Sequence, residues 1–416
     1  MTKHFEGDMP APNTEENLDL GIVPNEQIDP QEIMASIELN ESEDKEPEVQ
    51  IVKPIAKKPK NGKDEDKVAK ELYDEFSTFL EDKQDMTPEM ELKRTIPTGI
   101  DVLDAVLGGG FAIGALSIIV GQPGSGKSML AMQALGQAQR EFDGQLVGGY
   151  LDSEESTTSI RLSNLGVRYP KIKPYSDITI EKVFKFLEGL CLFKEKKKII
   201  DTPSIVVWDS IANTLSEKER EAEDVNQVIG YKARMLSILI PKYVAKCGQH
   251  NVSLISVNQL RDVMNIGQFA PAKDLKFMSA SKDMPGGNVL KFNAFHLLEM
   301  KVGKVLTQDK YGFDGVIAKT KCVKNKLFPP NIEIEILGSF TTGFSNFWTN
   351  YHFLTTTKRL STGAWNYLVS MPDKKFRTKD AEKEYHENPA FKEKYDEAVK
   401  EAIQTEIIDK YNPDLD

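Results

Sequence analysis

Cysteine, histidine and long apolar runs are scarce in this 416-residue chain, and each scarcity excludes a class of protein. Its three cysteines, Cys191, Cys247 and Cys322, lie far apart without paired spacing, so neither a disulfide framework nor a zinc site is expected. Its five histidines are scattered. No apolar run approaches the roughly 20 residues of a membrane span, and the N-terminus lacks the apolar stretch of a secretory signal. We therefore expect a cytoplasmic protein with no membrane partner.

The acidic charge is concentrated at one end of the chain. The formal net charge is −11, yet residues 1–50 hold fourteen acidic residues and two lysines, which leaves 51 basic and 50 acidic residues elsewhere. The acidic net charge therefore does not predict the charge of the binding surface on residues 51–416. Residues 1–50 are also poor in aromatics, which predicts disorder. Five lysines follow within 53–63 and indicate either a solvated linker or a basic arm that meets the acidic segment or a phosphate backbone.

The motif with the most specific chemistry is the P-loop spacing Gly121-Gln122-Pro123-Gly124-Ser125-Gly126-Lys127-Ser128, followed by Met129. Its glycines let backbone N–H groups surround an anion, Lys127 supplies a point charge, and the Ser128 hydroxyl can ligate Mg²⁺. An apolar strand-like run precedes the motif and a helical pattern follows it, so the phosphates would lie at a helix N-terminus. We expect a nucleotide such as ATP, with Mg²⁺.

Strand-like and helical patterns alternate after the P-loop, which predicts an α/β fold with a mainly parallel sheet covered by helices on both faces. The predicted strands are 148–152, 205–209, 252–258, 315–323 and 332–336, of which the last two could close the sheet at an edge; the predicted helices are 179–192 and 231–247. The expected division is an extension over 1–65, a helix and linker over 66–92, an ATPase core over 93–342 and a small C-terminal module over 343–416. The helix at 66–83 has one apolar stripe, which would dock on its own core or on a neighbouring subunit.

Polar side chains end three of the predicted strands. Asp209 closes an apolar strand in the form of a Walker B acid, which would hold Mg²⁺ through its water shell. Glu154 and Glu155 follow another strand, where one carboxylate could orient the attacking water; periodicity does not separate the two. Gln259 follows the third strand with a neutral amide that could sense the γ-phosphate.

Residues 260–285 form a long stretch without strong periodicity, which is unusual inside a compact domain unless it is functional. It mixes cationic with apolar side chains, the combination that proteins use to bind single-stranded nucleic acid. The candidate DNA contacts are Arg261, Phe269, Lys273, Lys276, Phe277 and Lys282. Aspartates nearly cancel their charge, so a disordered flap is the alternative.

Seven separated motifs follow the order of the RecA-type DNA recombinases, which this chain resembles. They are Pro97-Thr98-Gly99, the P-loop, Asp152-Ser153-Glu154 with Leu165-Gly166-Val167, residues 207–210, Asn258-Gln259, residues 286–292 and residues 323–326. The Asp-Ser-Glu element and the C-terminal layout around residues 363–365 and 388–391 are similar to the UvsX branch of phage recombinases. The resemblance implies a RecA-like P-loop core with an N-terminal helix and a small C-terminal α/β module.

The resemblance also implies an activity and roles for residues. The chain would be a DNA-dependent ATPase that forms helical filaments on single-stranded DNA and pairs it with homologous double-stranded DNA. Glu154 would be the catalytic carboxylate, and Gln259 would link the γ-phosphate to the DNA-binding loop after it. Lys324 and Lys326 would reach the ATP of the adjacent subunit.

Further sites follow from the same resemblance. The subunit interface would include Lys291 and Phe292. Single-stranded DNA would contact Gly286, Gly287 and Asn288, and a first DNA-binding loop would lie near Ser216–Asn226, which is rich in acids. Arg161 stands where the family usually has a tyrosine on adenine; a guanidinium can also stack.

Candidate partners include a loader and a single-strand-binding protein. Two alternatives remain open from the sequence: a ring-forming helicase or ATPase on the same core, and a non-catalytic scaffold in which nucleotide only locks the assembly.

Overall fold

The computed structural model describes residues 94–411, apart from 143–146, 156, 169–173, 225–227, 229 and 263–281. The chain divides into two units, Met1–Glu89 and Met90–Asp416, and all described residues belong to the second. The predicted extension over 1–65 and the predicted helix and linker over 66–92 lie outside the described residues.

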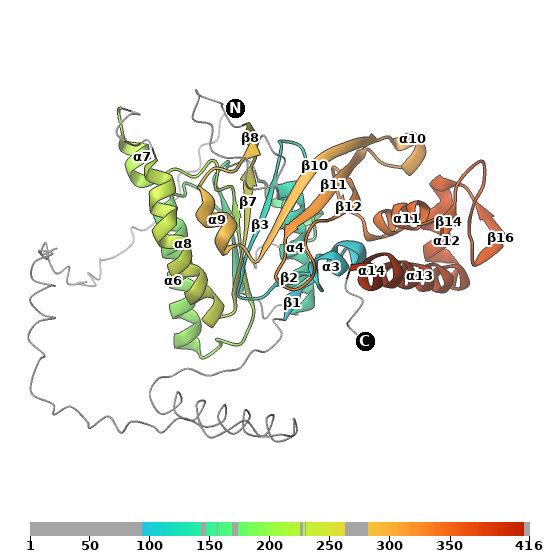
Figure 1. The fold of residues 1–416 in the computed structure, drawn as a ribbon, viewed down its shortest axis with the longest axis horizontal. Helices are drawn as coiled ribbons and strands as arrows, with labels where there is room; N and C mark the ends of the chain where they lie inside the picture. Colours follow the sequence, from blue (N-terminus) through green and yellow to red (C-terminus); the bar gives the residue numbers. More distant parts are fainter. Residues whose placement is uncertain are drawn as a thin grey trace, which may run out of the picture. The chain divides into compact units, whose positions relative to one another are not determined.

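A nine-stranded sheet forms the centre of the described residues (Figure 1). Six neighbouring strands run parallel, in the order β10 (His296–Leu306), β3 (Leu116–Gly121), β7 (Val252–Gln259), β6 (Ser204–Asp209), β4 (Val147–Asp152) and β5 (Pro174–Tyr175). Three antiparallel strands continue it beyond β10, namely β11 (Gly315–Lys324), β12 (Ile332–Ser339) and β13 (Gly343–Phe344). The predicted mainly parallel α/β fold is confirmed.

Helices cover both faces of this sheet. One face packs against α3 (Asp101–Leu107), α4 (Lys127–Glu141) and α5 (Ser159–Asn164), and the other against α6 (Ile180–Lys197), α8 (Tyr231–Gln249) and α9 (Asn288–Asn293). Every residue of β3 and β6 is buried, as a parallel strand covered on both sides requires. Among the described residues, no helix is long and apolar enough to cross a membrane.

Residues after β13 form a smaller α/β region with an aromatic core. It comprises α11 (Asn346–Thr356), β14 (Leu360–Ser361), β15 (Asn366–Leu368), β16 (Met371–Phe376), α12 (Ala381–Glu387) and α13 (Pro389–Ile403). The predicted module began at Gly343, but Gly343 and Phe344 pair with β12 and complete the main sheet, so the separate region begins after them.

The remaining short elements are β1 (Thr95–Ile96), β2 (Phe111–Ala112), α7 (Glu217–Glu221), β8 (Arg261–Asp262), β9 (Lys282–Asp283), α10 (Gln308–Tyr311), η3 (Thr378–Asp380), η4 (Gln404–Ile408) and α14 (Asp409–Tyr411).

Candidate functional site

Four adjacent strands bring the predicted polar residues to one edge of the sheet. β3, β7, β6 and β4 are parallel, and their ends lie close in register: Gly121 pairs with Gln259, Asp152 pairs with Asp209, and Asp209 pairs with Val257, two residues before the end of β7. These carboxyl ends lie together near β8 in Figure 1. Ligands of α/β proteins bind beyond the carboxyl ends of the strands, so this edge is the candidate site.

The P-loop connects β3 to α4 through two left-handed glycines, Gly124 at φ +76° and Gly126 at φ +90°. Glycine adopts this conformation without steric cost. Gly126 also caps α4, and a Cβ there would lie 2.6 Å from the ring of Phe344, so space excludes a side chain as well. The loop therefore presents the free N–H groups of the α4 N-terminus, which is a favourable position for phosphate.

Opposite charges meet under this loop. Lys127 is buried and its Nζ donates a hydrogen bond to the carbonyl of Gln122 at 2.8 Å. Burial lowers the pKa of Lys127, while the negative charges of Asp209 and Glu154 raise it. The ammonium thus lies within electrostatic range of both carboxylates, where it can also neutralise a phosphate oxygen.

The Walker B carboxylate is buried and hydrogen bonded. Burial raises the pKa of Asp209, and hydrogen bonds from Ser128 and Tyr150 lower it. The Tyr150 hydroxyl donates to Asp209 Oδ2 at 2.7 Å. The Ser128 hydroxyl and the Asp209 carboxylate therefore meet, and such hard oxygen donors fit Mg²⁺, which binds few protein groups and completes its shell with phosphate and water.

Glu154 lies at the exposed side of the same charges. Its carboxylate accepts a hydrogen bond from Asn213 Nδ2. Its negative charge raises the pKa of both Lys127 and Asp209. A carboxylate here is accessible to substrate and close to the phosphate-binding groups.

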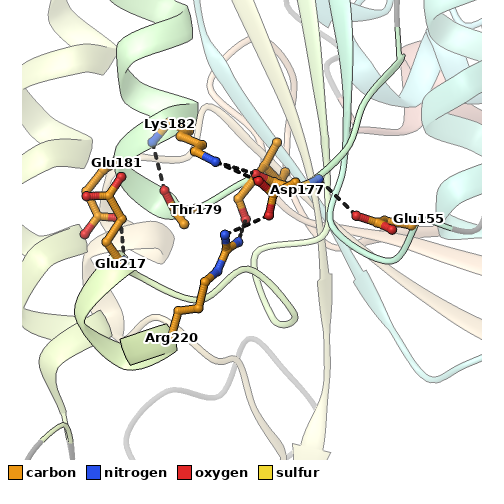
Figure 2. Close-up of polar contacts among 8 residues, drawn as sticks. Glu155, Asp177, Thr179, Glu181, Lys182, Glu217 and Arg220 are labelled. Atoms are coloured by element: carbon orange, nitrogen blue, oxygen red, sulfur yellow. Dashed lines mark hydrogen bonds and ion pairs between the residues drawn. The ribbon is translucent and has the colours of Figure 1, made fainter. Parts of the chain in front are cut away.

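Glu155 is held elsewhere, in a polar cluster before α6 (Figure 2). Its Oε1 accepts a hydrogen bond from the backbone N–H of Asp177 at 3.1 Å. Asp177 in turn pairs with Lys182 at 2.9 Å and with Arg220 at 2.7 Å. The side chains of the two glutamates that the sequence does not separate therefore take different partners.

Asn258 and Gln259, the last two residues of β7, connect the P-loop to the segment that follows this strand. Leu260, the residue after them, donates its N–H to the carbonyl of Gly121 at 3.3 Å. Asn258 donates its side-chain amide to the carbonyl of Pro285 at 2.8 Å, and its Oδ1 accepts from the N–H of Gln259 at 2.9 Å. The two ends of the 260–285 segment are thus both tied to the end of β7.

The predicted DNA contacts are described only in part. Phe269, Lys273, Lys276 and Phe277 lie outside the described residues, and for Arg261 and Lys282 only the backbone is described, in the antiparallel pair β8 and β9. Gly286 and Gly287 have φ of +100° and +80° and lead into α9, whose first residue, Asn288, is exposed.

The described part of the expected first DNA-binding loop near Ser216–Asn226 contains a short helix, and contact of this segment with DNA stays a prediction. Residues 217–221 form α7, which carries a complete capping box between Ser216 and Glu219. Because Ser216 caps the helix N-terminus and Glu219 reaches back to it, this acidic stretch is helical.

Lys324 and Lys326 lie far from the P-loop of their own chain. Lys324 and Ile118 are both Cα partners of Leu297, and Ile118 precedes Gly121 by about 10 Å of strand. β11 also lies two strands away from β3.

The last turn of α9 holds Lys324 in place. Lys324 Nζ donates to the carbonyls of Lys291 at 2.9 Å and Phe292 at 2.7 Å. Lys326 lies with its Nζ 5.7 Å from the ring centre of Phe295. Phe292 is 68% exposed, which is unusual for phenylalanine and gives this end of the sheet an apolar contact surface.

The sequence did not indicate a cavity of about 250 Å³ beside the P-loop. Its lining combines P-loop residues and Met129 with Arg161, Val316 and Phe340. Arg161 was expected near the nucleotide, whereas Val316 and Phe340 come from β11 and the β12–β13 turn. Phe340 is a large exposed aromatic, and because exposure is a property of the folded chain, no sequence pattern points to it.

A larger cavity of about 940 Å³ separates the main sheet from the C-terminal region. Four lysines line it, Lys301, Lys304, Lys310 and Lys319, and the one acid in its described lining, Glu335, is engaged by His352 at 2.6 Å and Lys319 at 3.6 Å. The lining, here called the lysine cleft, is therefore positively charged.

Comparisons with known proteins place these features in a family context. A family model described as the RecA N-terminal domain matches residues 80–345, more than half of the chain. The chain is 31% identical over 245 residues to protein RecA of Thermus thermophilus, covering 58% of this chain and 65% of that protein. It is 28% identical over 311 residues to protein RecA of Crocosphaera subtropica, covering 74% and 83%. The chain thus spans slightly less than two thirds of the length of the Thermus relative.

Proposed function

The chain belongs to the RecA family, and from that premise we propose that it is an ATP-dependent DNA recombinase. It polymerises on single-stranded DNA as a helical filament and exchanges strands with homologous double-stranded DNA. Its Asp-Ser-Glu element and C-terminal layout favour the phage UvsX branch. It would then act in the cytoplasm, that of the host if the chain is of phage origin, with a loader and a single-strand-binding protein as partners.

The observation that carries this proposal is the separation between the two halves of the nucleotide site. Lys127, Ser128 and Asp209 meet at the carboxyl edge of the sheet, whereas Lys324 and Lys326 lie toward the opposite edge. Within one protomer the two sets therefore lie toward different edges of the sheet. A head-to-tail assembly brings both sets to one ATP. It places the edge of one subunit that carries Lys324 and Lys326 against the carboxyl edge of the next subunit, and it continues as a helix.

The chemistry follows from the charges at the carboxyl edge. The P-loop backbone and Lys127 hold the phosphates. Ser128 and Asp209 would hold Mg²⁺, which would supply positive charge beside the phosphate oxygens. Glu154 orients the attacking water and accepts its proton as general base. Asn213, which donates a hydrogen bond to Glu154, fixes the direction of that carboxylate. Lys324 and Lys326 of the neighbouring subunit stabilise the charge that develops on the γ-phosphate.

Hydrolysis reaches the DNA through the end of β7. Gln259 hydrogen bonds the γ-phosphate without cancelling its charge. Loss of that phosphate shifts Gln259 and with it Asn258, whose amide holds the carbonyl of Pro285 at the far end of the DNA-binding segment. The contacts of Arg261, Phe269, Lys273, Lys276, Phe277 and Lys282 with single-stranded DNA then loosen together with the subunit interface.

The lysine cleft is the proposed binding site of the homologous duplex. Two of its four lysines pair with acids, Lys301 with Glu299 at 3.3 Å and Lys319 with Glu335 at 3.6 Å. Lys304 and Lys310 add positive charge of the kind that phosphate-backbone binding uses. Substituting Lys304 and Lys310 with alanine should lower strand exchange while ATP hydrolysis with single-stranded DNA stays unchanged. Lys383→Ala, at an exposed position of α12, is the matched control. Equal strand exchange by wild type, the double variant and this control would show that the duplex does not bind in this cleft.

The test of the whole proposal combines electron microscopy with phosphate release. With ATP and single-stranded DNA, we expect open helical filaments and DNA-stimulated hydrolysis that Glu154→Gln abolishes. Closed rings would favour a RecA-core helicase instead. Equal phosphate release with and without DNA, and in wild type and Glu154→Gln, would favour a nucleotide-locked scaffold.

A further inference from the structure

We propose that Asp177 is a positioning residue that couples α7 to the loop carrying Glu154, so that single-stranded DNA bound near Ser216–Asn226 raises the rate of ATP hydrolysis through this contact. This inference rests on the proposed function, because it names a route by which DNA stimulates the ATPase of the same chain. Asp177 lies in the connection between β5 and α6, and Figure 2 shows its carboxylate between side chains from different segments. It is thus placed to join elements that are distant in the sequence.

The carboxylate of Asp177 holds the end of α7. Arg220 of this helix donates from Nη1 to Asp177 Oδ1 at 2.7 Å and from Nη2 to the carbonyl of Ile178 at 3.2 Å. Lys182 of α6 donates to Asp177 Oδ2 at 2.9 Å. The hydrogen bond from Lys182 and the charge of Arg220 lower the pKa of Asp177. Each carboxylate oxygen therefore has its own cation, which fixes the orientation of the group between α6 and α7.

The backbone of Asp177 holds the residue after Glu154. The N–H of Asp177 donates to Glu155 Oε1 at 3.1 Å. Both of these residues have a left-handed backbone, Glu155 at φ +51° and Asp177 at φ +54°. Residues other than glycine adopt this conformation rarely and keep it where surrounding contacts define it. The hydrogen bond between the two residues is such a contact, so it helps to set the direction in which the chain leaves Glu154.

The start of α7 is attached to the start of α6. The N–H of Ile180 donates to the carbonyl of Leu215 at 3.0 Å. The N–H of Glu217 donates to Glu181 Oε2 at 3.0 Å, a contact that Figure 2 also shows. Because both ends of α7 are linked to the beginning of α6, a shift of α7 is transmitted to Asp177.

Glu154 therefore lies between two routes from α7. Along the chain, Asn213 stands three residues before the cap of this helix and donates a hydrogen bond to the Glu154 carboxylate. Across space, Arg220, Asp177 and Glu155 lead to the backbone beside Glu154. A shift of α7 on DNA binding would act on the carboxylate and on its backbone together. Such a shift changes catalysis, because a general base works only within hydrogen-bond reach of the attacking water.

The exposure of these ion pairs favours coupling over stability as their role. The side chains of Asp177, Lys182 and Arg220 are 68%, 46% and 41% exposed, and ion pairs at such positions contribute little to the free energy of unfolding. Their geometric effect is larger, since Asp177 joins segments that lie 22 and 43 positions away in the sequence. We therefore expect substitutions here to change the response to DNA while the melting temperature stays close to that of wild type.

The experiment measures the stimulation ratio of the full chain, which is the rate of phosphate release at saturating single-stranded DNA divided by the rate without DNA. We expect Asp177→Asn, which removes the charge and still tolerates a left-handed backbone, to lower this ratio about 2- to 30-fold. Arg220→Gln removes the same ion pair from the α7 side and should lower the ratio to a similar extent, and the double variant should lower it no further. Asp373→Asn, at an exposed aspartate of β16, is the matched control and should keep the wild-type ratio.

The outcomes separate this coupling from the proposed function. A wild-type chain that hydrolyses ATP equally with and without DNA would overturn the proposed function itself. A stimulated wild type with an unchanged ratio in Asp177→Asn would overturn only the coupling. An equal loss of both rates would also overturn it, because Asp177 would then support the site whether or not DNA is bound. So would a double variant whose loss is the product of the two single losses, because Asp177 and Arg220 would then act separately.

Discussion

Replacing Lys324 with alanine should abolish most ATP hydrolysis without unfolding the protein, because in the proposed filament this lysine acts on the nucleotide of the neighbouring subunit. A single ammonium about 4 Å from a phosphate charge, at an effective dielectric constant of about 20, contributes about 4 kcal/mol. If that contribution exists only as charge develops in the transition state, its loss lowers the rate by about three orders of magnitude. The side chain is partly solvated, so we expect a reduction of 100- to 1,000-fold, about 3 to 4 kcal/mol of barrier.

A mixing experiment tests the assignment between subunits. Lys127→Ala lacks a working P-loop but keeps Lys324, and Lys324→Ala has the reverse defect. In a one-to-one mixed filament, about one quarter of the interfaces combine an intact P-loop with an intact Lys324 from the next subunit, because the contact is head to tail. The mixture should therefore regain a substantial fraction of the wild-type rate, although each variant alone is inactive.

The refuting results are specific. Wild-type hydrolysis by Lys324→Ala would show that the lysine does not act on ATP. An inactive mixture that still forms filaments would show that the lysine acts within its own subunit or serves only to hold the last turn of α9, whose carbonyls it contacts. Lys383→Ala serves as the control for removing a surface lysine.

Three further predictions concern groups at the carboxyl edge and in the core. Glu154→Gln should lower the rate of phosphate release by about 10²- to 10⁴-fold with ATP binding retained. Glu155→Gln should release phosphate within a few-fold of the wild-type rate, because the Glu155 side chain has other partners. An equal loss of rate in both variants would contradict the assignment of Glu154 as the general base. Tyr150→Phe removes a hydrogen bond that lowers the pKa of Asp209, so the acidic limb of the ATPase pH profile should move to higher pH, and an unmoved profile would sink the idea. Burial raises the pKa of Asp104 to about 7, so the folded state binds a proton that the unfolded state releases near pH 4. The free energy of unfolding that this group contributes is lost as pH rises toward and through 7. From pH 5 to pH 8, the melting temperature of Asp104→Asn should therefore rise relative to that of wild type. A difference in melting temperature that stays constant over this range would contradict the raised pKa of Asp104.

The parallel strands could be predicted from the sequence because burial on both faces leaves an uninterrupted apolar run. The runs ending at Gly121, Asp209 and Gln259 all form adjacent strands of the sheet. β10 was not predicted, although it lies directly beside β3. Its first residues are buried, but residues 301–305 are exposed and include two lysines, so the strand has no single pattern along its length. A strand that leaves the core halfway mixes two environments, and periodicity alone does not separate them.

The position of the site could be predicted from the sequence, but the contacts of its side chains with residues distant in the sequence could not. Polar residues at strand ends meet at one edge because the strands are parallel and in register, which is a local property of each strand. The difference between Glu154 and Glu155 depends on Asn213 and Asp177, which are distant in sequence. The cavity wall at Phe340 likewise depends on how the β12–β13 turn docks on α4.

The geometry of β7 offers a route by which, in the proposed function, one phosphate would affect both DNA and the next subunit. β7 is the neighbour of β3 and β6, so its last residues lie between the P-loop and the Walker B acid. From there the chain enters the 260–285 segment, returns at Pro285 to a hydrogen bond with Asn258, and continues directly into α9. The last turn of α9 holds Lys324 by two carbonyls. Under the proposed function, a displacement at the end of β7 would act on both ends of the candidate DNA-binding segment and on the helix that holds Lys324. Nucleotide state, DNA binding and subunit contact would then need no separate linkages.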